Sequence, residues 1–132
     1  AGMIQKMNQF RETDSKAYRD IYLNIGYLVE ELVDAIKGND KEKIIKLINE
    51  NHSLLSELAK KSKIEIETRE LRKLHEIARK YGAGKLSGAG GGDCGIGVCF
   101  AKGSADKMKK AWSANGLQVV DVDIENDGVR IE

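Results

Sequence analysis

The strongest chemical signal in the sequence is a run of glycines preceded by a lysine and a serine. Eight of the 14 glycines lie between Gly82 and Gly97. Consecutive residues without a Cβ allow successive backbone N–H groups to point toward one centre, and such a concave nest binds anions such as phosphate. Lys85 and Ser87, directly before the longest glycine stretch, can add a positive charge and a hydroxyl. The segment therefore predicts a phosphate-binding loop.

The candidate binding loop starts two residues after Lys85, which is itself a candidate phosphate contact. The loop consists of Ser87, Gly88, Ala89, Gly90, Gly91, Gly92 and Asp93. A second interpretation stays open, in which the glycines serve a tight turn and close helix–strand packing. Lys85 is equally well explained as a solvated lysine at a strand end. Asp93 either orients an acceptor or a water-bound Mg²⁺, or forms a hydrogen bond within its own loop.

Two familiar nucleotide-binding motifs are excluded by their surroundings. The segment 90–95 matches G-x-G-x-x-G, but it leads into a predicted strand, whereas a dinucleotide-binding fold needs a helix there. Gly84 and Lys85 resemble the end of a Walker A loop, but Leu86 occupies the position of its Ser or Thr. The phosphate-binding loop is therefore of another kind.

The cysteines and histidines predict no metal site, and no residue of this chain is assigned as catalytic. Cys94 and Cys99 are five residues apart, without a second ligand pair. We interpret them as reduced side chains on a buried strand, which favours a cytoplasmic location. His52 and His75 lie on predicted helices among charged residues, so we expect positions at the surface or at the edge of the core.

The composition excludes several classes of protein. The 132 residues include 22 basic and 21 acidic side chains, and the formal net charge is +1. This balance argues against nonspecific binding to nucleic acid. The apolar runs are too short for a membrane helix, and the first residues do not resemble a secretory signal. The length suits a single domain or one lobe of a larger protein.

The residues before the glycine run predict three helical regions. Residues 4–37 have helical periodicity with a break at 13–15, and Gly38 can end that helix. Residues 41–60 form its antiparallel partner. A third helix begins after Thr68 and extends to residue 81. Residues 61–67 alternate apolar and polar side chains, which fits either a short strand or an extended linker.

The second half of the sequence predicts strands and one further helix. We expect strands at 85–87, 94–101 and 117–124, a helix at 103–116, and a final edge strand at 129–131. The second of these strands is expected to be buried. The predicted fold class is α+β, in which a helical hairpin and a third helix pack on a mostly antiparallel four-stranded sheet.

Residues 82–96, with the sequence GAGKLSGAGGGDCGI, resemble the third signature motif of the GHMP kinases, a family named for galactokinase, homoserine kinase, mevalonate kinase and phosphomevalonate kinase. The ending GGGDCG is most similar to the bacterial phosphomevalonate kinases. The helices before it, including residues 51–55, resemble the C-terminal lobe of that family. The resemblance implies a ferredoxin-like C-terminal domain over residues 3–132, preceded by Ala1 and Gly2, which we interpret as a remnant of an expression fusion.

The resemblance implies a two-lobed kinase that transfers the γ-phosphoryl group of ATP, with Mg²⁺, to phosphomevalonate in isoprenoid precursor synthesis (the mevalonate pathway). In such enzymes the third motif contacts phosphate or acceptor, so residues 87–93 would line that cleft. The family's ATP loop, P-x-x-x-G-x-G-S-S-A, is absent from this sequence, which has no proline. We therefore expect an N-terminal lobe of the same enzyme as partner, with ATP and Mg²⁺ bound mainly there, and no kinase activity for this chain alone.

Three other interpretations stay open. The parent enzyme could be another GHMP kinase, such as mevalonate kinase. The chain could instead be a non-catalytic α+β module that binds an anion, or a helical module whose residues 4–60 pack on a partner. For a separated lobe we also expect an exposed apolar surface, because its partner lobe would normally cover it.

Overall fold

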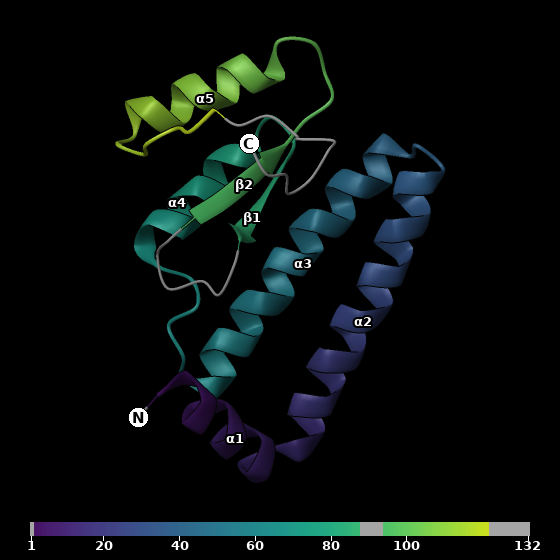
Figure 1. Cartoon of the computed structure of the whole chain (residues 1–132), viewed down its shortest axis with the longest axis vertical. Helices are drawn as coiled ribbons and strands as arrows, with labels where there is room; N and C mark the ends of the chain where they lie inside the picture. Colours follow the sequence, from purple (N-terminus) through teal and green to yellow (C-terminus); the bar gives the residue numbers. More distant parts are fainter. Residues whose placement is uncertain (1, 88–93, 122–132) are drawn as a thin grey trace, which may run out of the picture.

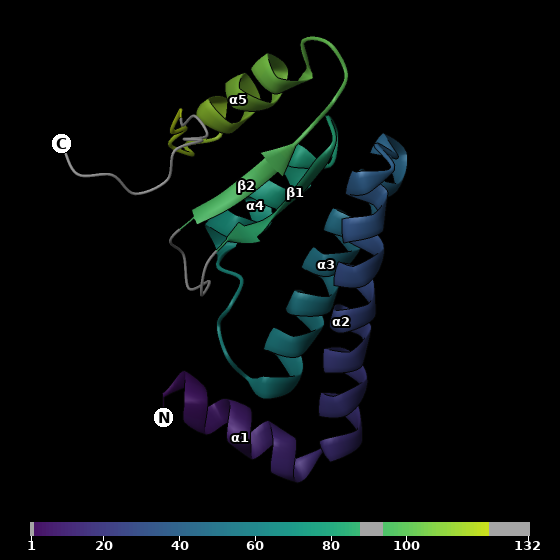
Figure 2. The same cartoon turned by 45° about the vertical axis from the view of Figure 1, so that its right-hand side comes forward.

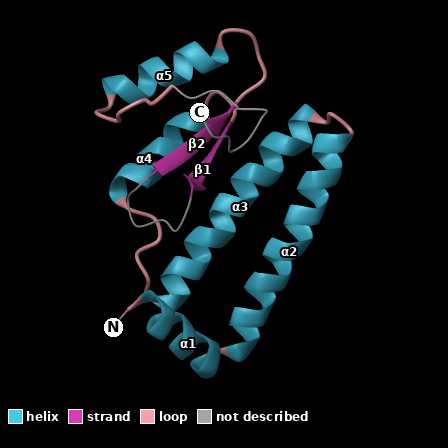
Figure 3. Cartoon of the chain, in the orientation of Figure 1, coloured by secondary structure: helices cyan, strands magenta, loops and turns pink. Residues whose placement is uncertain are grey.

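The computed structural model describes residues 2–87 and 94–121, which contain five helices and one β-hairpin (Figure 1, Figure 3). The elements in chain order are α1 (Met3–Thr13), α2 (Ser15–Lys37), α3 (Lys41–Ser62), α4 (Arg69–Ala78), β1 (Ala83–Ser87), β2 (Cys94–Val98) and α5 (Ser104–Ala114). The predicted loop at 88–93 and the predicted edge strand at 129–131 lie outside the described residues. None of the described helices is both long enough and apolar enough to cross a membrane.

Side-chain caps define where three of the helices begin. Asp14 forms the predicted break, and its carboxylate accepts a hydrogen bond from the first turn of α2 at 3.1 Å. Asp40 and Thr68 cap α3 and α4 in the same way, at 3.2 and 3.3 Å. Such caps each contribute about 1 kcal/mol. Gly38 ends α2 as predicted, although the left-handed conformation is adopted by Asn39, with φ of 53°.

The helices α2 and α3 lie antiparallel and side by side, and α1 crosses one end of the pair (Figure 1, Figure 2). One apolar cluster joins α2 and α3 to the start of β1 and consists of Leu28, Ala35, Ile44, Leu47, Ile48 and Ala83. The other joins α1, the start of α2, the end of α3 and the segment after it, α4 and β1. It consists of Phe10, Ile21, Leu58, Ile64, Ile66, Leu71 and Leu86. Residues 63–68 are therefore the linker and not the strand: Ile64 and Ile66 alternate because they point into this core.

The hairpin pairs β1 with β2 in antiparallel register, from Ala83 opposite Val98 to Ser87 opposite Cys94. The predicted four-stranded sheet is not seen in the described residues, because 117–121 form no strand and 122–132 lie outside them. The prediction of a buried strand at 94–101 is wrong. The strand ends at residue 98, Cys94 is exposed, and Ile96 is 45% exposed.

Glycines bring the hairpin unusually close to two helices. A Cβ built on Gly84 would lie 2.5 Å from the Cβ of Ala78 in α4, and one on Gly95 would lie 2.7 Å from a methyl group of Leu74. A Cβ on Gly97 would collide with Met108 of α5. α4 and α5 therefore pack on the same face of the hairpin, which leaves the face of Ile96 uncovered by these helices. For these glycines the packing interpretation is confirmed.

The outer face of α2 carries apolar side chains that the described residues leave exposed. Tyr22, Val29, Val33 and Ile36 are between 43% and 58% exposed. Their spacings of seven, four and three residues place them on one stripe of the helix. Gly26 lies on the same stripe, and no heavy atom would come within 4 Å of a Cβ added there.

Candidate functional site

The candidate site lies on the face of the hairpin opposite α4 and α5. Because side chains alternate along a strand, Lys85 and Ser87 share this face, and their paired residues on β2 are Ile96 and Cys94. The other end of the same face is covered, since Ala83 packs in the core between α2 and α3. On this face, Lys85 and Ser87 therefore lie beside the exposed Ile96 and Cys94, whereas Ala83 is covered. Ser87 is the last residue of β1, directly before residues 88–93.

Lys85 is half-buried and so differs from a fully solvated strand-end lysine. None of the ion pairs formed by the described residues involves its ammonium group. Burial removes water from the charge and lowers the pKa of Lys85 below its usual value of 10.5. A partly dehydrated cation gains more from an anionic ligand than a solvated one does, because the cost of dehydration has already been met.

The strand that carries Lys85 is fixed at its edge by side chains of two helices. The Gly84 N–H donates to Oδ1 of Asn49 at 3.2 Å, and Nδ2 of Asn49 donates to the Gly82 carbonyl at 3.3 Å. The Gly84 carbonyl accepts a hydrogen bond from Nδ1 of His75 at 2.5 Å. Asn49 on α3 thus provides the donor and acceptor that a neighbouring strand would supply, and His75 adds an anchor from α4.

The two histidines are buried, so the predicted surface position is wrong, whereas the predicted core-edge position agrees with the surface cavity that both rings border. His52 is 3% exposed and His75 is 7% exposed. Their rings stack with centroids 3.6 Å apart and planes 7° apart. The sequence contains the signal, since His52 follows Ile48 by four residues and His75 follows Leu71 by four. Both histidines therefore continue an apolar helical stripe.

Glu67 connects the stacked rings to α3. Its Oε1 lies 3.3 Å from Nε2 of His52, and its Oε2 accepts a hydrogen bond from Ser56. Arg72 of α4 lies 3.6 Å from the same carboxylate. Burial alone would raise the pKa of Glu67, but the Ser56 hydrogen bond, the contact with His52 and the charge of Arg72 together hold it below 4.5.

Burial is the main reason that the pKa of His52 lies below its usual value of 6.5, and repulsion from His75 and Lys85 lowers it further. The interaction with Glu67 opposes this shift without cancelling it. At neutral pH His52 is therefore neutral and Glu67 is ionised. Because an ionised carboxylate only accepts hydrogen bonds, Nε2 of His52 carries the proton and Nδ1 does not.

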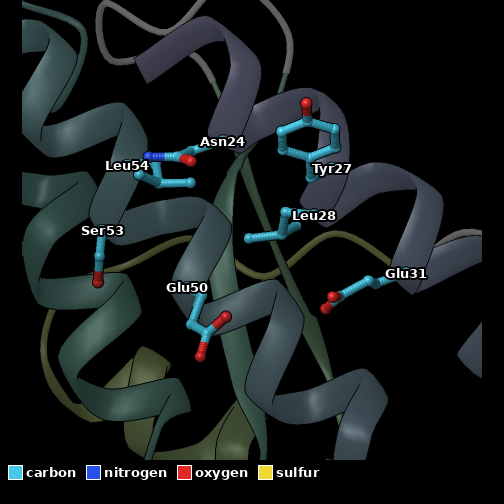
Figure 4. A pocket seen from close by; sticks show the side chains of 7 residues that line it. All are labelled: Asn24, Tyr27, Leu28, Glu31, Glu50, Ser53 and Leu54. Carbon is cyan, nitrogen blue, oxygen red and sulfur yellow. The ribbon is translucent and has the colours of Figure 1, made fainter. Parts of the chain in front are cut away.

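A separate pocket of about 380 Å³ lies in the groove between α2 and α3 (Figure 4). Tyr27 and Glu31 line it from α2, and Glu50 and Ser53 from α3. None of its lining residues belongs to the hairpin, so the pocket is separate from the candidate site.

Across residues 2–87 and 94–121, no three His, Cys, Asp or Glu side chains come together in a way that could hold a metal ion.

Comparison with models of protein families identifies the family of this chain. A profile described as GHMP kinases C terminal matches residues 8–118. The chain belongs to the GHMP kinase family. In GHMP kinases this C-terminal domain is paired with an N-terminal lobe, and the family uses ATP and Mg²⁺. The family predicted from the glycine motif is thereby confirmed.

Two solved structures resemble this GHMP kinase domain. The Lin0012 protein from Listeria innocua is 33% identical with a TM-score of 0.83, and the match covers 88% of this chain and 33% of that one. L. major mevalonate kinase in complex with R-mevalonate is 22% identical with a TM-score of 0.74, and the match covers 85% of this chain and 33% of the kinase. The chain thus spans about a third of each structure that it matches. No curated protein sequence matches it.

The structure describes only part of the predicted GHMP site. It places Lys85 and Ser87 together on the open face of the hairpin. The other predicted loop residues, Gly88 to Asp93, lie outside the described residues. Sequence reasoning missed the residues that fix the edge of β1, namely Asn49 and His75, and the stacking of His52 on His75.

Proposed function

We propose that this chain is the C-terminal lobe of a GHMP kinase that phosphorylates phosphomevalonate with ATP, and that residues 87–93 line the cleft for phosphate and acceptor. The observation that carries the proposal is the pair formed by Lys85 and Ser87. One side chain supplies a partly dehydrated positive charge and the other a hydroxyl, on a strand anchored to two helices. The choice of phosphomevalonate rests on the similarity of the ending GGGDCG to the bacterial phosphomevalonate kinases.

The described residues fit a phosphate group but not the metal ion. Lys85 and Ser87 provide a cation and a hydrogen-bond donor, whereas no described cluster of carboxylates fits Mg²⁺. ATP, when bound, supplies the phosphoryl group that is transferred. We therefore place the metal ligands and most of the ATP contacts on the N-terminal lobe, and propose that this chain alone does not turn over ATP.

Phosphoryl transfer depends largely on positioning and on stabilisation of negative charge. In the proposed cleft, Lys85 neutralises charge on a phosphate oxygen and the Ser87 hydroxyl donates a hydrogen bond to it. Residues 88–92 lie outside the described residues, and we propose from the glycine sequence that their backbone N–H groups add further donors for the anion. The anchoring of Gly84 holds the strand in place, so that these donors do not have to be reorganised when the ligand binds.

The test is a comparison of ADP release by the protein of the complete reading frame with phosphomevalonate, mevalonate and homoserine as acceptors. We expect the largest kcat/KM with phosphomevalonate, and no ADP release by the 132-residue chain alone. Lys85→Met should lower kcat/KM by about 10- to 100-fold, the loss typical of one charged hydrogen bond. Lys80→Met, at an exposed lysine after α4, is the matched control and should change little. A larger kcat/KM with mevalonate, or a Lys85→Met enzyme with unchanged kcat/KM, would contradict the proposal.

A second candidate function follows from the exposed stripe on α2. Tyr22, Val29, Val33 and Ile36 would suit a helical module that packs on a partner. Sedimentation of the 132-residue chain distinguishes the two functions: the interaction module should form a stable oligomer that Val29→Lys disrupts. A monomer at all concentrations would exclude self-association through this stripe.

A further inference from the structure

A line of buried and half-buried polar side chains runs from α3 to β1. Ser56 donates to Glu67, Glu67 accepts from Nε2 of His52, the ring of His52 stacks on His75, and His75 donates to the Gly84 carbonyl. The line therefore ends on the strand residue directly before Lys85. The stack is thus joined to β1 by the hydrogen bond from His75 to the Gly84 carbonyl.

The unpartnered atom in this line is Nδ1 of His52. It is buried, and none of the described residues forms a hydrogen bond with it. Because Nε2 carries the proton directed at Glu67, a second proton must bind at Nδ1. A buried N–H group without an acceptor is strongly unfavourable, so the folded arrangement resists this protonation.

The surroundings add to this resistance. A positively charged His52 would face the ring of His75 at 3.6 Å, and Lys85 on β1 also repels it. Glu67 is the one group in direct contact that favours the charge. The other charged residues around the stack are Glu57, Lys60, Arg72, Glu76 and Arg79. They line a surface cavity of about 510 Å³ that also borders both rings, through which protons from solvent can reach the stack.

We propose that the stacked pair of His52 and His75 is a proton-sensitive latch on β1. With His52 neutral, the stacked rings hold Gly84 against α3 and α4, and protonation at Nδ1 of His52 releases the strand edge. Release would shift Lys85, which follows Gly84 directly, and Ser87, which lies two residues further along the strand. The latch stands or fails independently of the proposed kinase function, because it concerns the strand and not its ligand.

The direction of the pH effect follows from the pKa of His52, which is lower in the folded protein than its usual value of 6.5. The opened state binds the proton more readily, so the closed latch loses stability as the pH falls through 6.5 and below. For one histidine that stays neutral in the closed state, the opening equilibrium rises by up to about eightfold between pH 7.0 and 5.5. The chain contains one other histidine, His75, whose ring is stacked on that of His52.

The experiment is amide hydrogen exchange of the Gly84 N–H in the 132-residue chain, followed by NMR between pH 7.0 and 5.5 and corrected for the intrinsic exchange rate. We expect its protection to fall several-fold, up to about eightfold, while amides in the middle of α2 change less. A flat profile for Gly84, or an equal change in all elements, would overturn the latch.

Two substitutions separate the proton effect from a purely structural role. In His52→Gln the amide can donate to Glu67 from the position of Nε2 but cannot be protonated, so the protection of Gly84 should depend much less on pH than in the wild type. Ser53→Ala, at the adjacent exposed residue, should retain the wild-type profile. A His52→Gln variant with unchanged pH dependence would refute the proposal. If that variant does not fold, the His52 ring signals of the wild type decide: the latch requires a titration midpoint below 6.5 for the closed state, and a midpoint at or above 6.5 overturns it.

Discussion

Replacing Gly84 by alanine tests whether the close approach of β1 to α4 sets the position of the hairpin. The new Cβ would lie 2.5 Å from the Cβ of Ala78, which has no rotamer that moves it away. Ordinary contact needs roughly 3.5 Å, so α4 and β1 must separate by about 1 Å. Overpacking of this kind costs about 1–3 kcal/mol, and weakening of the hydrogen bonds to Asn49 and His75 adds about 1 kcal/mol. We expect Gly84→Ala to lower the free energy of unfolding by about 3 kcal/mol.

Urea unfolding measures this change, with far-ultraviolet circular dichroism reporting the helices. The single tryptophan, Trp112, reports the contact between α4 and α5, since its indole donates to the Leu74 carbonyl at 3.1 Å. Gly26→Ala is the matched control, because no atom lies within 4 Å of its added Cβ and α2 gains a better helix former. It should raise stability by about 0.8–1 kcal/mol. A loss below about 0.5 kcal/mol for Gly84→Ala would show that the close approach is not a constraint.

Three further predictions concern local contacts. Asn49→Ala leaves the Gly84 N–H and the Gly82 carbonyl without partners and should cost about 1–3 kcal/mol in urea unfolding, whereas Ser53→Ala on the same helix should cost less than about 0.5 kcal/mol. Asp40→Ala removes the cap of α3 and should cost about 1 kcal/mol, and an unchanged unfolding midpoint would contradict this. The pKa of Glu67 is held below 4.5, so its stabilisation is complete above that pH and is lost as the pH falls through the folded value. Glu67→Gln should therefore flatten the decline in stability below pH 4.5, and an unchanged slope would refute the assignment.

The helical half of the fold could be predicted from the sequence because its signals are local. The cap residues Asp14, Asp40 and Thr68 and the apolar stripes define helices whose observed bounds differ from the expected ones by a few residues. The alternation at residues 61–67 was ambiguous for a physical reason. A linker whose isoleucines point into a core has the same pattern as a strand, and only the tertiary contacts distinguish the two.

The sequence predicts only those site residues that lie next to one another in a recognisable motif. Lys85 and Ser87 were found because they precede the glycine run, and the GHMP motif identified the family. Asn49, His52 and His75 were not found, because their importance arises from contacts between residues that are far apart in sequence, such as Asn49 with Gly84. The glycines were also harder to interpret than the pattern suggested, since the run mixes packing positions such as Gly84 and Gly97 with the candidate loop.

The side chain of Asn49 also affects which edge of the hairpin can pair with a further strand. At the start of β1, the edge groups of Gly84 and of Gly82, which precedes the strand, already have partners in Asn49 and His75. An incoming strand could pair there only by displacing α3. Strand addition, whether in folding or in unwanted association between molecules, is therefore biased toward the edge of β2. Helix α3 therefore ends the β-sheet at the edge of β1, through the side chain of Asn49.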